Sequence, residues 1–120
     1  MDLTAEAQSP EGPRSIPLNE LEEESHDSGV SDRAVLVNGI RWAMVEYGAG
    51  CGRANWCATP HSGYVVAGSI RYEFEDGRSP LAVGAGNAFL LTATPRHRGL
   101  NAGREPARLF LIDALPAPPG

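Results

Sequence analysis

Several features that would place this chain in a membrane, on nucleic acid or outside the cell are missing. No hydrophobic run approaches the ~20 residues of a membrane-spanning helix, so we expect no membrane partner. The ten basic residues are spread from Arg14 to Arg108 in a chain of formal net charge −5. Nucleic-acid surfaces need concentrated positive charge, so this partner is excluded. The N-terminus, MDLTAEAQSPEGPRS, carries no apolar stretch of a secretory signal, and we expect a cytoplasmic location.

Cysteine is also scarce. The two cysteines, Cys51 and Cys57, lie six residues apart and do not form a CxxC pair, so no zinc knuckle is indicated. In a reducing compartment we expect no structural disulfide between them. Two small buried thiols are one interpretation. Cys57, between Trp56 and His61, leaves a role at a functional site open.

Long stretches of helical periodicity are absent, and short β-like segments take their place. The 14 glycines and 10 prolines punctuate the chain at the spacing of short strands. Ser69–Glu75 is the clearest strand, with Ile70, Tyr72 and Phe74 on one face. Asn38-Gly39 between two apolar runs predicts a tight hairpin. The other predicted strands are Ala34–Val37, Ile40–Tyr47, Tyr64–Ala67, Leu81–Val83, Ala88–Leu91 and Arg108–Asp113.

With 120 residues, we expect one domain in three parts. Residues 1–30 are predicted to form a flexible N-terminal arm with an edge strand near residues 16–21. Residues 31–115 are predicted to form the barrel, and residues 116–120 a tail. About eight short strands without helices suit a sandwich or a closed barrel.

Two sets of residues are spaced in a way that points to a known family: Gly86, His97 and Asn101 form one, and Asn55, Cys57, His61 and Gly68 form the other. Their spacings resemble the two motifs of the cupin superfamily of small β-barrels. The second cupin motif runs Gly, five residues, Pro, one residue, Gly, two residues, His, three residues, Asn. Here Gly86, His97 and Asn101 occupy its glycine, histidine and asparagine positions, and threonines stand where Pro and the second Gly are usual. The first motif ends at Gly68, and the residues that fall at its ligand positions, counted back from that glycine, are His61, Cys57 and Asn55.

The resemblance implies an all-β fold, a single-domain cupin jelly-roll β-barrel, with a small-molecule pocket at its open end. It also implies a homodimer. Where the family has Glu and the second His of its HxH, this chain has His61 and Cys57, which are also able to bind metal. His61, His97 and Cys57 would therefore hold a divalent metal such as Zn, Fe, Mn or Ni. The expected pocket residues are Asn55, Trp56, Tyr64, Tyr72 and Asn101.

Three functions remain open. The first is a metal-dependent enzyme of the oxygenase, isomerase or cyclase type, using His61 and His97. The second is a cupin that binds or senses a small molecule or metal without catalysis. The third is a metal-free enzyme in which His61 or His97 serves as an acid or base. Arg96 and Arg98 flank His97 with opposite parity and are predicted to face outward, although one of them could reach the pocket.

Overall fold

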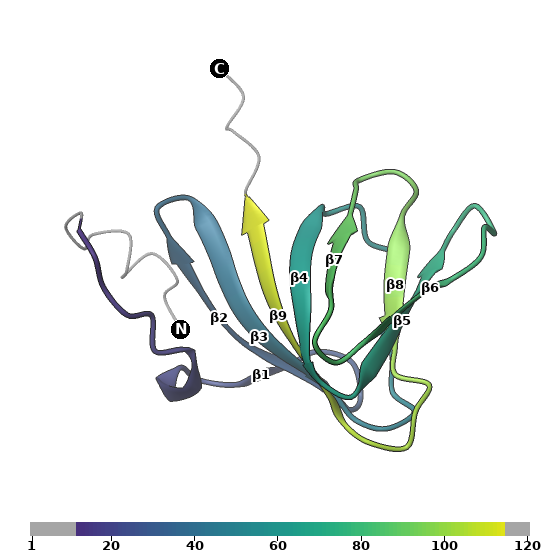
Figure 1. Cartoon of the computed structure of the whole chain (residues 1–120), viewed down its shortest axis with the longest axis horizontal. Coiled ribbons are helices and arrows are strands. Elements are labelled where there is room, and N and C mark those ends of the chain that lie inside the picture. The colour runs from purple at the N-terminus through teal and green to yellow at the C-terminus, as the bar shows by residue number, and fades with distance from the viewer. Residues whose placement is uncertain (1–11, 115–120) are drawn as a thin grey trace.

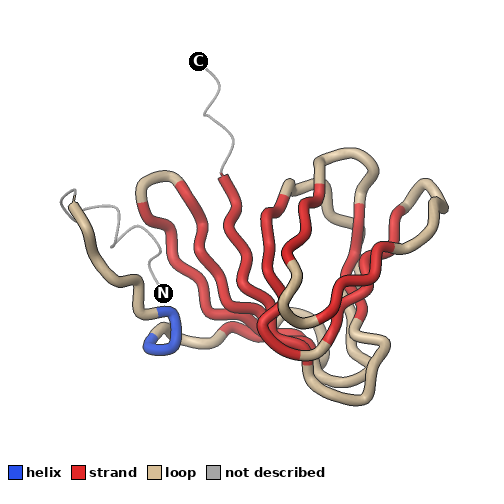
Figure 2. The backbone as a smooth tube through the Cα atoms, viewed as in Figure 1, coloured by secondary structure: helices blue, strands red, loops and turns tan. Residues whose placement is uncertain are grey.

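The computed structural model describes residues 12–114, and these residues fold into nine strands and one short 3-10 helix. Figures 1 and 2 show two layers of strands facing each other. The expectation of an all-β chain is confirmed for the described residues. The elements, in chain order, are the 3-10 helix η2 (Leu18–Glu20), β1 (Glu24–Ser25), β2 (Val30–Val37), β3 (Ile40–Tyr47), β4 (His61–Ala67), β5 (Ser69–Phe74), β6 (Leu81–Gly84), β7 (Ala88–Leu91), β8 (His97–Leu100) and β9 (Ala107–Ala114).

The strands form two antiparallel sheets. The larger has the order β1-β2-β3-β9-β4-β7, and the smaller has the order β6-β5-β8. Figure 1 shows β5, β6 and β8 as a second wall opposite the larger sheet. The last strand, β9, lies between β3 and β4 in the middle of the large sheet. None of the helices among residues 12–114 is long and apolar enough to cross a membrane.

The core fills the space between the sheets and follows the period-two alternation of the strands. Val45, Val65 and Leu109 come from the large sheet. Ile70 and Tyr72 come from the small one, as the alternation in Ser69–Glu75 predicted. The Asn38-Gly39 hairpin is also confirmed, with φ angles of 52° and 76° at the two turn residues. Positive φ at both positions matches the twist of the flanking strands.

Gly68 makes the corner at which the chain leaves the large sheet for the small one. Its φ is +75°, and a Cβ atom built there would lie 2.4 Å from the carbonyl oxygen of Pro106. Only glycine fits both the backbone angle and this close approach. The corner carries the chain from β4 of the large sheet to β5 of the small one.

The N-terminal prediction needs correction. The segment near residues 16–21 forms the 3-10 helix η2 and not an edge strand. Pro17 explains the difference, because it fixes φ and its carbonyl accepts a hydrogen bond from Glu20 N in a turn. Residues 24–25 and 30, expected within the arm, belong to β1 and β2 of the large sheet. The rest of the predicted arm, residues 1–11, and the predicted tail, residues 116–120, lie outside the described residues.

Strand β8 escaped the sequence prediction because its four residues, HRGL, show no apolar alternation. It pairs with β5 on one side. On its other side it meets the loop before β4 through isolated bridges, Gly52 with Leu100 and Cys57 with His97. This loop therefore acts as an added edge to the small sheet and brings Cys57 beside His97.

Candidate metal and ligand site

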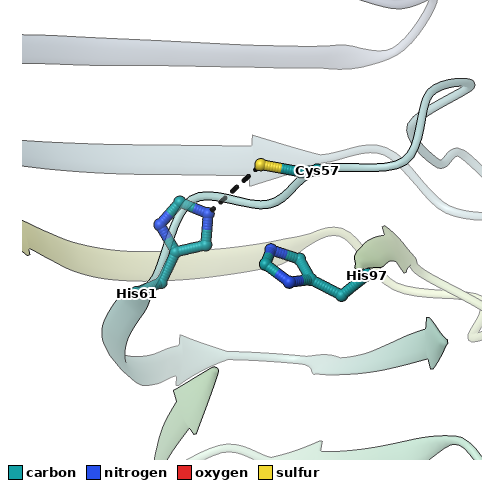
Figure 3. Close-up of side chains that lie close together, drawn as sticks. All are labelled: Cys57, His61 and His97. Atoms are coloured by element: carbon teal, nitrogen blue, oxygen red, sulfur yellow. Dashed lines mark hydrogen bonds between the residues drawn. The ribbon is translucent and has the colours of Figure 1, made fainter. Parts of the chain in front are cut away.

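Two histidines and a cysteine meet between the sheets, although they come from three separate segments. His61 opens β4 of the large sheet, and His97 opens β8 of the small one. The backbone of Cys57 donates to the His97 carbonyl at 2.7 Å, and His97 N donates to the Cys57 carbonyl at 2.9 Å. The two imidazole rings lie edge to face with 5.2 Å between their centroids. Figure 3 shows the thiol of Cys57 directed at the His61 ring, with the His97 ring beside them.

The three side chains are close enough to share one ion. Each offers one ligand atom, and these three atoms all lie within 4.8 Å of one another. The Cys57 Sγ and the His61 Nε2 are 4.0 Å apart. Two imidazoles and a thiolate are a donor set that suits zinc, and also iron. The residues that the sequence proposed as metal ligands are thus brought together.

A buried ionic network holds His61 from behind. The Nδ1 of His61 donates to Asp113 Oδ1 at 2.5 Å. The other oxygen of Asp113 accepts from Arg41 at 3.3 Å, and Arg41 also donates to Asp32 at 2.8 Å. The two carboxylate side chains are only 3% and 7% exposed.

The network determines which nitrogen of His61 faces the site. An ionised carboxylate can only accept hydrogen bonds, so Nδ1 must carry the proton. In the neutral ring Nε2 then has the lone pair, and it is the atom that points toward Cys57. A histidine that donates its second nitrogen to a carboxylate is the common arrangement behind metal ligands.

His97 is held differently. The residue is 2% exposed, and neither ring nitrogen has a hydrogen-bond partner among the described residues. Burial, with His61 as a further cause, lowers the pKa of His97 from 6.5 to about 4. The ring is therefore neutral near pH 7, which is the form that binds metal. A buried imidazole with two unmatched nitrogens is unfavourable without a partner, and an ion at this point would supply one.

A cavity of about 420 Å³ opens beside the three side chains. Two tyrosines on its wall, Tyr47 and Tyr72, are nearly buried. Burial raises the pKa of Tyr47 to about 12 and the pKa of Tyr72 well above its ordinary value. Both hydroxyls are thus protonated near neutral pH. A cavity of this size accommodates a small organic molecule.

Of the five residues expected in the pocket, Asn55, Trp56 and Tyr72 line this cavity. Tyr72 also meets the His97 ring edge to face at 5.9 Å. Arg98 lines the cavity too, and its guanidinium lies 4.2 Å above the Trp56 ring. Arg98 is thus the flanking arginine that reaches the pocket, which the sequence had left open for one of the two. Arg96, by contrast, is exposed and pairs with Glu75.

Two expected pocket residues lie elsewhere. Tyr64 is 44% exposed on the outer face of the large sheet, because its position in β4 has the opposite parity to Val65 in the core. Asn101 is fully buried and binds backbone only. Its amide donates to the carbonyls of Tyr47, Gly48 and Glu105, and its oxygen accepts from Gly103 N. Asn101 thus fixes the turn after β8.

Four charged residues near the site were missed from the sequence. Arg41, Arg53 and Asp32 line the cavity, and Asp113 supports His61. A signal for Asp113 was present, because the alternation in β9 places it on the same face as Leu109 and Leu111. A carboxylate on a core-facing position needs a partner. No comparable signal named His61 or Arg41 as that partner, since their contacts depend on strand pairing.

No family model matches the sequence, and no protein of curated function is similar enough in sequence to be matched. Comparison of structures is more informative. The polyketide cyclase RemF from Streptomyces resistomycificus superposes with a TM-score of 0.74 at 14% identity, over 90% of this chain and 83% of its own. An RmlC-like cupin from Shewanella frigidimarina gives 0.64 at 16% identity, over 80% of this chain and 85% of its own. A cupin-superfamily sugar phosphate isomerase from Silicibacter pomeroyi gives 0.66 at 12% identity, over 86% of this chain and 76% of its own.

Identities this low establish a shared fold and leave the activity open. Three observations indicate the same fold. They are the two facing antiparallel sheets, the two histidines at the cavity and the structural neighbours. The described residues therefore have the cupin fold, with two histidines and a cysteine gathered at the site.

Proposed function

We propose that this chain is a metal-dependent enzyme that holds a divalent ion between Cys57, His61 and His97 and acts on a small organic molecule in the adjoining cavity. The observation that carries the proposal is the meeting of three ligand atoms within 4.8 Å of one another. The unmatched nitrogens of His97 support it, because a metal would satisfy one of them.

Zinc is the ion that this donor set favours, and iron is the second choice. Thiolate and imidazole ligands suit both, whereas Mn²⁺ is better served by carboxylates and water. Three protein ligands leave a position open for substrate or water. When bound, such an ion acts as a Lewis acid that polarises a carbonyl group.

The chain's own residues divide the remaining work. Asp113 keeps the proton of His61 on Nδ1, so that Nε2 is available at the site. The protonated hydroxyls of Tyr47 and Tyr72 offer hydrogen-bond donors on the cavity wall. Trp56 adds an aromatic surface for the apolar part of a substrate.

Isomerisation or cyclisation fits this site better than oxygenation. Both reactions rearrange a carbonyl compound with a Lewis acid and proton donors, and neither needs a redox-active ion. Two of the structural neighbours are a cyclase and an isomerase. Oxalate oxidase is also among the neighbours, with a TM-score of 0.67, so the preference for isomerisation or cyclisation rests on the site and not on the neighbours.

Metal analysis of the purified chain tests the proposal. We expect one equivalent of metal in the wild type and none in His97→Ala. His26→Ala is the matched control, because His26 belongs to a second, more exposed group with Glu24 and Asp32. Loss of metal in His26→Ala alone would move the site to that group. Absence of metal after loading with Zn, Fe, Mn and Ni would refute the metal-dependent function.

A further inference from the structure

Cys57, His61 and Asp113 lie in the order of a nucleophile, a base and an orienting carboxylate. The thiol Sγ is 4.0 Å from Nε2 of His61, and the Nδ1 on the far side of the same ring is 2.5 Å from Asp113 Oδ1. A nucleophile beside a base whose other nitrogen is held by a carboxylate is the arrangement of cysteine and serine acyl-transfer enzymes. The order depends on geometry alone and recurs on unrelated folds.

We propose that the metal-free chain has a second activity, in which Cys57 is an acyl-accepting nucleophile for activated esters and thioesters. His61 is the base, and Asp113 is the residue that positions it. The proposal goes beyond the metal-dependent function, because it concerns the chain with no ion bound.

The surroundings of the three residues fit these roles. Asp113 is 2% exposed, and Arg41 binds its second oxygen, so the carboxylate is fixed in place. The His61 side chain is 15% exposed and lines the cavity with Cys57. The backbone N–H of Thr59 lies 3.4 Å from Sγ and donates to the sulfur. Because Cys57 lines the cavity, an acyl group bound there has access to the thiol.

The reaction balances with water as the only co-reactant. The Cys57 thiol proton moves to His61 Nε2 as the sulfur attacks the carbonyl carbon and forms a C–S bond. The bond to the leaving alcohol or thiol breaks, and this group takes the proton from Nε2. Water, deprotonated by the same nitrogen, then attacks the acyl carbon. The carboxylic acid leaves and the sulfur regains a proton.

Metal binding and acyl transfer compete for the same atoms. An ion held by Sγ and Nε2 would use the sulfur and the lone pair that the acyl reaction needs. Zinc is therefore expected to suppress the acyl reaction in proportion to its occupancy.

p-Nitrophenyl acetate is the probe, used with the full chain stripped of metal in excess chelator. We expect a burst of nitrophenolate, and peptide mapping should place the acetyl group on Cys57. Cys57→Ala should abolish the burst, and Cys51→Ala, the matched control, should retain it. His61→Gln should slow acylation about 100-fold, the lower range for loss of a general base.

The positioning role of Asp113 has its own readout. Proton–nitrogen NMR of the metal-free wild type should show His61 protonated at Nδ1 and bare at Nε2. In Asp113→Asn the preference for this tautomer should weaken, and acylation should slow at least about 10-fold. A wild-type ring protonated at Nε2 instead would overturn the assigned order, and this measurement needs no variant.

Other outcomes would overturn the proposal. One is acetylation of Cys51 and Cys57 at equal rates in the folded wild type. Another is an unchanged acylation rate in a folded His61→Gln. Zinc binding is measured separately, without the ester. If the chain binds zinc but resists acylation when stripped of metal, the acyl-transfer proposal fails and the metal-dependent function stands. If Cys57 is acylated but the chain binds no zinc, the metal-dependent function fails and the acyl-transfer proposal stands.

Discussion

Replacing His97 with leucine should make the metal-free protein more stable, although His97 is among the most buried side chains. His97 and Asn101 are both buried polar residues, with exposures of 2% and 0%. They differ in their partners. Asn101 binds three carbonyl groups and one backbone N–H, whereas neither nitrogen of His97 has a partner among the described residues.

The expected magnitudes follow from this difference. A buried polar group without a hydrogen bond costs about 1–3 kcal/mol. Leucine has a volume similar to histidine and removes that cost, so His97→Leu should raise the free energy of unfolding by about 1 kcal/mol. Asn101→Leu leaves several backbone groups unmatched at once and should lower it by about 3 kcal/mol or more.

Urea unfolding of the metal-free variants measures both effects, with an unchanged m-value as the condition for comparison. The same unfolding measurement is repeated in the presence of zinc. At about 100 times its dissociation constant, zinc should stabilise the wild type by about 2.7 kcal/mol and leave His97→Leu unaffected. If His97→Leu were destabilised as strongly as Asn101→Leu, the ring would be an ordinary satisfied core histidine, and the reasoning would be refuted.

Three further predictions concern other parts of the structure. Between pH 6.5 and about 4, the unfolded chain takes up a proton that folded His97 does not. The free energy of unfolding of the metal-free wild type should therefore decrease as the pH is lowered through this range, by up to about 3 kcal/mol. Urea titrations of His97→Leu should not show this loss. Asp113→Asn should weaken zinc binding about 10–100-fold in a competition with a chromophoric chelator. Asp76→Asn, which alters only an exposed pair with Arg78, should bind zinc as the wild type does. Gly68→Ala should lose more than about 2 kcal/mol of unfolding free energy, because of the positive φ and the contact with Pro106, and a loss below about 0.5 kcal/mol would contradict the close approach.

Local sequence patterns predicted the elements whose structure depends mainly on residues close to them in the sequence. The Asn38-Gly39 turn and the alternation over Ser69–Glu75 predicted their strands correctly, because hairpins and half-buried strands leave short-range patterns. The spacing around Gly86 and His97 pointed to the cupin fold. Strand β8 was missed because its pairing with β5, and not its own composition, makes it a strand.

The site was only partly predictable for the same reason. Cys57, His61 and His97 were found through motif spacing. Asp113 joins them through the pairing of β9 with β3 and β4, which no local pattern reveals. Tyr64 was expected in the pocket, but its position in β4 has the opposite parity to the buried Val65. The expected homodimer and cytoplasmic location stay predictions.

Cobalt substitution of the purified chain offers a direct view of the ligands. A Co²⁺ ion bound by a cysteine thiolate shows a sulfur-to-metal charge-transfer band, and tetrahedral coordination intensifies the visible bands. We predict both features in the wild type and in Cys51→Ser. In Cys57→Ser the charge-transfer band should vanish, and in His97→Ala both features should weaken together. A cobalt spectrum without a thiolate band in the wild type, or one that Cys57→Ser leaves unchanged, would contradict a metal site built from Cys57, His61 and His97.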